Sequence, residues 1–251
     1  MSSGLSTLVI LAGGKGTRMG VYSKQLPKPV VLINKKPLIS YLITWAMKNH
    51  FRKVIIAGGH LYESLKSEVL NFYKSKEYIV DDYTSKINLK KNFSIIIRNT
   101  GKDALTGQRL FCIRDLLNNQ KEFVLTYGDT LTDIKINKVH NLFKDTSSTI
   151  CLVAGFPEAR YGEILTEGNR VLSFKEKERP KFRVNRGFYI INSKIFDDWR
   201  PRIFKSLEFN VIPYFVNKDK VFAYRSDDWF FSVDTQNDVN ELSKKFKHNL
   251  K

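Results

Sequence analysis

Cysteine is scarce in this chain, and long apolar runs are absent. The 251 residues include two cysteines, Cys112 and Cys151, which form neither a CxxC pair nor a metal-ligand spacing. Both lie in or beside apolar segments, so we expect buried free thiols, as in a reducing cytoplasm, rather than a disulfide. No run approaches the roughly 18 apolar residues of a membrane span. Residues 1–7 lack the basic and apolar segments of a secretory signal, so we expect a cytoplasmic protein.

Two familiar nucleotide-binding loops are also missing. The Walker A pattern G-x-x-x-x-G-K-[ST] occurs nowhere in the chain. The dinucleotide fingerprint G-x-G-x-x-G fails because Gly14 and Gly16 would need a third glycine where Met19 stands. Zinc-finger spacing and aromatic–basic RNA signatures are absent as well. The net charge of +17 is therefore not assigned to nucleic acid, and we expect part of it to serve anionic small substrates.

A glycine-rich turn follows the first apolar run. Leu8–Ile10 leads into Leu11-Ala12-Gly13-Gly14-Lys15-Gly16-Thr17-Arg18, and Pro27-Lys28-Pro29 comes about ten residues later. Glycine lets backbone N–H groups approach oxygen atoms and adopt positive φ, while Arg18 and Lys28 supply positive charge. The pattern predicts a polyphosphate cradle, and hence a nucleotide site, at the carboxyl end of the first strand.

Strands and helices alternate along the first part of the chain. Apolar, β-branched runs predict strands at 8–11, 54–57, 93–97, 123–126 and 149–153, and the helical period appears around 38–45, 61–72 and 110–117. Such alternation predicts parallel crossover units in a Rossmann-like, doubly wound α/β sheet. Further on we expect a hairpin at 161–165 and 171–174, strands at 184–191 and 221–224, and helices at 193–199 and 235–246. We therefore expect one domain over 1–251 with a mixed, mostly parallel sheet and the antiparallel hairpin over the pocket.

Two aspartates are candidate metal ligands. Thr126-Tyr127-Gly128-Asp129 ends a predicted buried strand on the same rim as the glycine-rich turn. A carboxylate there suits Mg²⁺, which prefers hard oxygen ligands and phosphate oxygens, although Asp also commonly follows a strand as a turn residue. Asp234, in Ser232-Val233-Asp234-Thr235, could complete the site, or Asp234 or Thr235 could simply cap the last helix.

Several segments together resemble the sugar 1-phosphate nucleotidyltransferases, and they occur in family order. Besides the turn at 11–18, Pro27-Lys28-Pro29 and the Asp129 and Asp234 segments, they are Thr100-Gly101, 105–110 (LTGQRL), 174–177 (FKEK) and 185–189 (NRGFY). Within that family, the 105–110 segment and Thr-Tyr-Gly-Asp most resemble the glucose-1-phosphate cytidylyltransferases. The resemblance implies a GT-A-like nucleotidyltransferase fold, with a nucleotide-binding part over 1–155 and a sugar-phosphate part over 156–251.

The resemblance also implies roles for individual residues. The nucleotide would be held by Leu11, Ala12, Gly13, Gly14, Gly16, Thr17, Arg18, Lys28, Thr106, Gly107, Arg109 and Gly128, with Thr106, Gly107 and Arg109 beside the cytosine of CTP. The acceptor would be bound by Tyr127, Glu176, Lys177, Asn185, Arg186 and Gly187. Asp129 and Asp234 would hold Mg²⁺, and Arg18, Lys28 and Lys177 would be the catalytic cations. The implied partners are CTP and a sugar 1-phosphate, with activated sugar feeding polysaccharide synthesis.

The chemistry needs no activated protein nucleophile. A sugar phosphate is mostly dianionic near neutral pH and can itself attack the α-phosphorus of the nucleotide, with pyrophosphate leaving. The protein would act by positioning and electrostatics.

Departures from the family pattern leave alternatives open. Arg186 stands where a small residue is usual, Glu178-Arg179-Pro180 replaces a proline directly after the Glu-Lys pair, and Gln108 replaces a second glycine. Arg186 could contact an anionic group of the acceptor or face solvent. Another nucleotide, a non-sugar phosphate acceptor, or an inactive nucleotide- or nucleic-acid-binding module remain alternatives, and a homo-oligomer is compatible with the sequence.

Overall fold

A nine-stranded mixed sheet forms the body of the protein. The computed structural model describes residues 4–16, 26–74, 76, 78–90, 92–157, 162–176, 178 and 180–248. The sheet has the order β14-β10-β13-β8-β1-β4-β7-β6-β5. Its parallel centre consists of β1 (Thr7–Ala12), β4 (Lys53–Gly58), β7 (Phe93–Asn99) and β8 (Glu122–Tyr127). The flanking strands are β5 (Tyr78–Asp81), β6 (Thr84–Lys90), β10 (Ile150–Gly155), β13 (Val184–Asn192) and β14 (Val221–Arg225), of which β6 and β13 run opposite to the rest of the sheet.

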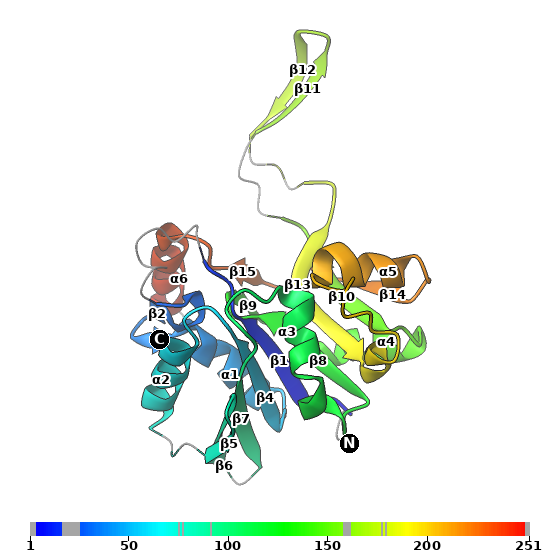
Figure 1. Cartoon of the computed structure of the whole chain (residues 1–251). Coiled ribbons are helices and arrows are strands. Elements are labelled where there is room, and N and C mark those ends of the chain that lie inside the picture. The colour runs from blue at the N-terminus through cyan, green and yellow to red at the C-terminus, as the bar shows by residue number, and fades with distance from the viewer. Residues whose placement is uncertain are drawn as a thin grey trace.

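Helices cover both faces of this sheet (Figure 1). The first face carries α1 (Leu38–Lys48), α2 (Tyr62–Tyr73), α4 (Ile136–Asp145) and α6 (Gln236–His248). The second face carries α3 (Thr106–Cys112), the 3₁₀ turns η3 (Arg114–Leu117) and η4 (Ser193–Phe196), the π-helical turn η5 (Leu207–Val211) and α5 (Ile212–Val216). Strands β13 and β14, from the second half of the chain, belong to the same sheet as β1.

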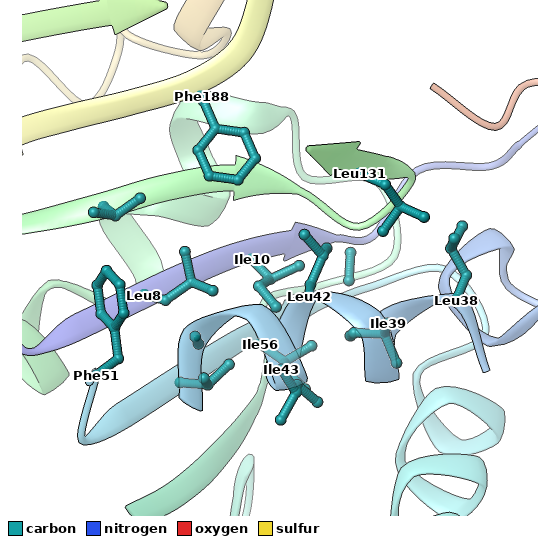
Figure 2. Close-up of a cluster of buried hydrophobic side chains, with 14 of the residues drawn as sticks. Leu8, Ile10, Leu38, Ile39, Leu42, Ile43, Phe51, Ile56, Leu131 and Phe188 are labelled. Atoms are coloured by element: carbon teal, nitrogen blue, oxygen red, sulfur yellow. The ribbon is translucent and has the colours of Figure 1, made fainter. Parts of the chain in front are cut away.

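Strand β1 is buried on both sides, as a central parallel strand must be. Leu8 and Ile10 point to the first face, whereas Val9 and Leu11 belong to the core on the second face. Figure 2 shows Leu8 and Ile10 beside side chains of α1, among them Leu42 and Ile43. Burial on both faces holds the carboxyl end of β1 rigidly, and the glycine-rich turn starts there.

Three small ribbons lie outside the main sheet. The ribbon of β9 (Thr130–Thr132) and β15 (Phe230–Ser232) joins the loop after β8 to the segment before α6. Next to the glycine-rich turn, the 3₁₀ turn η2 (Lys28–Val30) precedes the ribbon of β2 (Leu32–Ile33) and β3 (Lys36–Pro37). The third ribbon is the hairpin of β11 (Glu163–Glu167) and β12 (Arg170–Lys175).

The position of the β11–β12 hairpin corrects one expectation. Figure 1 shows the hairpin extending away from the body, and the strands pair with each other rather than with the main sheet. Its side chains are largely exposed, including Ile164 and Phe174. Among the described residues none from the hairpin lines the pocket, so the hairpin does not cover it.

The predicted α/β class is confirmed, and so are the five predicted strands of the first half. The hairpin, β13, β14 and α6 also lie where they were expected, whereas the predicted helix at 110–117 divides into α3 and η3. The sequence reading missed β5, β6, α4, and the η5–α5 segment. Both cysteines are free, but Cys112 is exposed and only Cys151 is buried, which corrects the expectation for Cys112. No helix in the described part of the chain is long and apolar enough to cross a membrane.

Candidate active site

The main candidate site is a pocket of about 670 Å³ at the carboxyl ends of β1 and β8. Eleven residues assigned to binding from the sequence line it: Leu11, Ala12, Gly13, Gly14, Gly16, Lys28, Thr106, Arg109, Tyr127, Gly128 and Asp129. Its other lining residues are Lys15, Pro29, Lys102, Asp103, Ala104, Leu105, Ser206, Glu208 and Phe209. The location agrees with the rule that ligands bind outside the carboxyl ends of parallel strands.

The glycine-rich turn is held in place by Arg109. Its guanidinium is buried and donates to the carbonyl oxygens of Gly13 (2.8 Å), Gly101 (2.9 Å) and Gly58 (3.2 Å), and to Thr100 Oγ1 (2.7 Å). These groups lie at the carboxyl ends of β1, β4 and β7, with Gly58 the last residue of β4 and the others directly after β1 and β7. Arg109 therefore joins three strand ends by hydrogen bonds, and most of its donors are used within the protein. Arg109 also lines the pocket, and its place beside the base, which the family resemblance implied, stays a prediction.

Glycines at the pocket make room for different neighbours. A β-carbon at Gly13 would overlap the Arg109 guanidinium, and one at Gly128 would come within 2.7 Å of the Pro29 ring. At Gly14, by contrast, a β-carbon would meet no atom of the described residues within 4 Å. Gly16 has φ of +59°, a left-handed conformation that glycine adopts without strain. The turn thus leaves open space at Gly14 through which a ligand can approach the backbone.

Lys28 lies between the two predicted metal ligands. Its Nζ donates to Asp129 Oδ2 at 3.0 Å and to Asp234 Oδ1 at 2.7 Å, and all three side chains are at least 70% buried, with exposures of 10%, 27% and 16%. Burial alone would lower the pKa of Lys28, but the ion pairs and hydrogen bonds with the two carboxylates outweigh it and raise that pKa above its ordinary value. Lys28 therefore stays charged at neutral pH.

The β9–β15 ribbon brings the two aspartates together although they are 105 positions apart. Ser232 pairs with Thr130, and the Val233 amide donates to the Asp129 carbonyl oxygen at 2.9 Å. The start of α6 is capped by Thr235, whose Oγ1 accepts from the Asp238 amide, while the Asp238 carboxylate accepts from the amides of Asp234 and Thr235. The carboxylate of Asp234 is thus directed to Lys28, while another residue supplies the cap.

The donor set fits a magnesium ion that is also bound by a ligand. Asp129 and Asp234 both reach one nitrogen atom, so their oxygens converge on a common point. Mg²⁺ typically takes one or two protein carboxylates and completes its shell with phosphate oxygens and water. Within the described residues there is no cluster of three or more His, Cys, Asp and Glu that could hold a metal without such help.

The pocket lining includes a carboxylate, that of Glu208, that the sequence analysis did not identify. Glu208, at the start of η5, accepts hydrogen bonds from Thr106 Oγ1 (2.6 Å), Ser206 Oγ (2.8 Å) and the Tyr127 hydroxyl. Burial, followed by the neighbouring Tyr189 and Glu208, raises the pKa of Tyr127, so its hydroxyl remains a donor. A lone glutamate in a segment without clear periodicity offered no sequence signal.

The predicted acceptor-binding residues do not all lie in the pocket. Asn185 donates to the Tyr189 hydroxyl at 2.5 Å, which in turn lies 3.2 Å from the Tyr127 hydroxyl. Gly187 has φ of +69° and its Cα packs on the ring of Tyr127. Asn185 and Gly187 therefore contact the two tyrosines, and of the acceptor residues that the structure describes only Tyr127 lines the pocket itself.

Arg186, Glu176 and Gly107 also lie outside the pocket lining. Arg186 donates to the Phe156 carbonyl oxygen and its guanidinium lies 4.5 Å from the Phe230 ring centre, so it is neither in the pocket nor directed to solvent. Glu176 is exposed beyond the end of β12. Gly107 packs against the backbone of Phe204 and Lys205. The predicted site residues Thr17, Arg18 and Lys177 lie outside the described residues.

Comparison with known proteins places the chain in a family. The Nucleotidyl transferase family matches residues 7–231, and the chain belongs to this family.

One relative is a glucose-1-phosphate cytidylyltransferase of Salmonella typhi, which is 27% identical over 75% of this chain and 76% of the relative. Another is a D-glycero-alpha-D-manno-heptose 1-phosphate guanylyltransferase of Campylobacter jejuni, which is 29% identical over 92% of this chain and 95% of the relative. One similar solved structure is HddC from Yersinia pseudotuberculosis, with a TM-score of 0.69 and 20% identity over 96% of this chain and 100% of that chain. Another is a UDP-glucose pyrophosphorylase complexed with UDP-glucose, with a TM-score of 0.69 and 17% identity over 98% of this chain and 99% of that chain. The structural likeness shows the fold.

Proposed function

We propose that this protein transfers a nucleotidyl group, CMP from CTP in the first instance, to a sugar 1-phosphate, releasing pyrophosphate. The observation that carries this proposal is the group of Lys28, Asp129 and Asp234 beside the open glycine turn. The pocket then offers backbone groups for a polyphosphate and a buried cation, and Asp129 in its lining, together with Asp234 on the other side of Lys28, offers two carboxylates for Mg²⁺. Relatives with glucose-1-phosphate and heptose 1-phosphate in their names support a sugar phosphate as acceptor.

In this proposal the protein contributes binding and charge rather than a nucleophile. Gly13, Gly14 and Gly16 present the backbone to the triphosphate, and Lys28 neutralises charge on the phosphates. Asp129 and Asp234 would hold Mg²⁺, which when bound offsets phosphate charge and orients the phosphate oxygens. Arg18 and Lys177 keep the cationic roles that the family resemblance implies. The acceptor phosphate oxygen attacks the α-phosphorus, the bond to the bridging oxygen breaks, and pyrophosphate leaves.

The choice of CTP rests on the 105–110 segment and on the cytidylyltransferase relatives. GTP is the second candidate, because two guanylyltransferase relatives match over more than 90% of this chain and one has the higher identity, 29%.

The test is pyrophosphate release with Mg²⁺, crossing CTP, GTP, UTP, dTTP and ATP with a panel of sugar 1-phosphates and non-sugar phosphates. Turnover with CTP and one sugar 1-phosphate is the expected result. Turnover with GTP would retain the mechanism and replace the nucleotide. Binding of a nucleotide without turnover of any acceptor would contradict the proposed activity and favour a binding module.

A further inference from the structure

A directed chain of hydrogen bonds ends at Glu208. Asn185 Nδ2 donates to the Tyr189 hydroxyl, and Tyr127 donates its single hydroxyl proton to Glu208 Oε1. In the contact between the two tyrosines, Tyr189 must therefore be the donor to Tyr127. On the other side of the carboxylate, Thr106 and Ser206 donate to Oε2. Glu208 thus connects the wall built by β8 and β13 with the start of α3.

The backbone around Glu208 is fixed by the same groups. The Leu207 amide donates to Thr106 Oγ1 at 2.9 Å, and the Phe209 amide donates to Ser206 Oγ at 3.2 Å. Both hydroxyl groups therefore accept from the π-helical turn and donate to its carboxylate. Short π-helical segments occur frequently at functional sites because they reposition side chains. Here the turn presents Glu208 and Phe209 to the pocket.

Glu208 retains capacity to bind a ligand. An ionised carboxylate has about four lone-pair positions, and described residues occupy two on Oε2 and one on Oε1. No cation in the described part of the chain forms an ion pair with it. The remaining lone-pair position is on Oε1, and the Glu208 side chain lines the pocket. It can accept a hydrogen bond from a hydroxyl or an amino group.

Phe209, the next residue, is unusually exposed. The residue is 85% accessible, yet it lines the same pocket as Lys28. Leaving a phenyl ring exposed forgoes the stabilisation that its burial would bring. The ring offers an apolar face beside a hydrogen-bond acceptor. That combination suits a hydroxylated ring, which has polar edges and apolar C–H faces.

We propose that Glu208 and Phe209 form the acceptor-ring subsite, and that this subsite selects a neutral or amino-substituted hydroxylated ring over one that bears a carboxylate. The proposal rests on the function proposed above and specifies its acceptor. Glu208 accepts a hydrogen bond from a ring hydroxyl or amino group, and Phe209 covers one face of the ring. A carboxylate on the ring would face the Glu208 carboxylate, and like charges repel strongly in a partly buried site. Arg186, which lies outside the pocket lining, does not offset that repulsion.

The test compares the full-length wild type with Glu208→Gln and Phe209→Ala. Steady-state rates are measured with glucose 1-phosphate, glucosamine 1-phosphate and glucuronic acid 1-phosphate, and direct binding of the same compounds is measured by calorimetry. We expect both variants to raise the KM for glucose 1-phosphate about ten-fold, with the KM for the nucleotide within about two-fold. Only Glu208→Gln should lower the preference for glucose 1-phosphate over glucuronic acid 1-phosphate, because only that variant removes the negative charge.

Matched controls are Glu63→Gln, an exposed carboxylate on α2, and Phe182→Ala, an exposed phenylalanine outside the pocket. Phe209→Ala removes a ring that is mostly in solvent, so it tests the subsite even if Glu208→Gln unfolds the protein. Unchanged acceptor KM and binding in both variants would overturn the subsite and leave the proposed activity standing. Weakened binding of glucose 1-phosphate in the variants, in a protein that turns over no acceptor, would support the subsite and contradict the proposed activity. Failure of the wild type to bind any of the three compounds would overturn the subsite.

Discussion

The guanidinium of Arg109 lies where a side chain at position 13 would have to be. Arg109 Nη2 donates to the Gly13 carbonyl oxygen at 2.8 Å, and a β-carbon at Gly13 or at Gly59 would overlap the guanidinium. The glycine-rich turn therefore serves two purposes, because Gly14 leaves the pocket open while Gly13 admits the arginine that fixes the turn. The shape of the nucleotide cradle depends on a residue 96 positions further along the chain.

Replacing Arg109 with lysine should destabilise the protein and weaken nucleotide binding. A lysine ammonium cannot reproduce the planar fork that reaches three segments, so buried carbonyl groups would lose their donors. We expect the free energy of unfolding to fall by about 2 kcal/mol or more, measured by urea denaturation. The control Arg114→Lys, at an exposed guanidinium that stacks on Phe111, should change it by no more than about 0.5 kcal/mol. Equal effects of the two substitutions would contradict the role of Arg109.

Asp129→Asn should make turnover more dependent on Mg²⁺. The change removes one charged oxygen ligand and leaves Lys28 paired with Asp234 alone. We expect the Mg²⁺ concentration at half-maximal rate to rise about ten-fold or more, while the melting temperature changes little. Asp198→Asn, at an exposed aspartate paired with Lys218, serves as the control. Wild-type rates for Asp129→Asn across the whole Mg²⁺ titration would contradict the metal assignment.

The raised pKa of Lys28 gives a prediction about alkaline stability. A group whose pKa is higher in the folded state stabilises the protein below its unfolded pKa, near 10.5, and this contribution is lost as the pH rises through the folded value. The difference in unfolding free energy between wild type and Lys28→Met should therefore be constant from about pH 8 to about pH 9.5 and shrink above 10.5. Lys48→Met, on the exposed side of α1, controls for general alkaline effects. A wild-type advantage that instead grows as the pH rises from about 8 toward 10.5 would show a lowered pKa and contradict the prediction.

The two cysteines should differ in reactivity. Cys112 is exposed, whereas burial raises the pKa of Cys151 to about 11. A thiol reagent at about pH 8 reacts with the thiolate, so we expect one fast-reacting group per chain in the folded protein and two in denaturant. Cys112→Ser should remove the fast reaction. If that variant still reacts rapidly when folded, Cys151 is more accessible than the structure shows.

Local pattern was sufficient for the parallel centre of the fold. The runs at 8–11 and 54–57 are wholly apolar because both faces of those strands are buried. The runs at 93–97 and 123–126 each contain one polar residue, Ser94 and Thr126, and are still conspicuous in the sequence. Strands β5 and β6 were missed because β5 lies exposed at the sheet edge and β6 mixes polar with apolar residues. The pairing of Asp129 with Asp234 was inferred from family likeness, and only the β9–β15 ribbon explains it physically.

The sequence by itself determined that a glycine turn ends the first strand and that Lys28, Asp129 and Asp234 are available to a nucleotide site. It also determined the alternation that produces the sheet, since periodicity depends on neighbours along the chain. Only the tertiary structure decided that Arg109 is directed into the protein, that the hairpin stands away from the pocket, and that Glu208 lies in its wall. The physical reason is that each of these depends on contacts between segments far apart in sequence, and no local pattern encodes which carbonyl group or hydroxyl group a long side chain will meet.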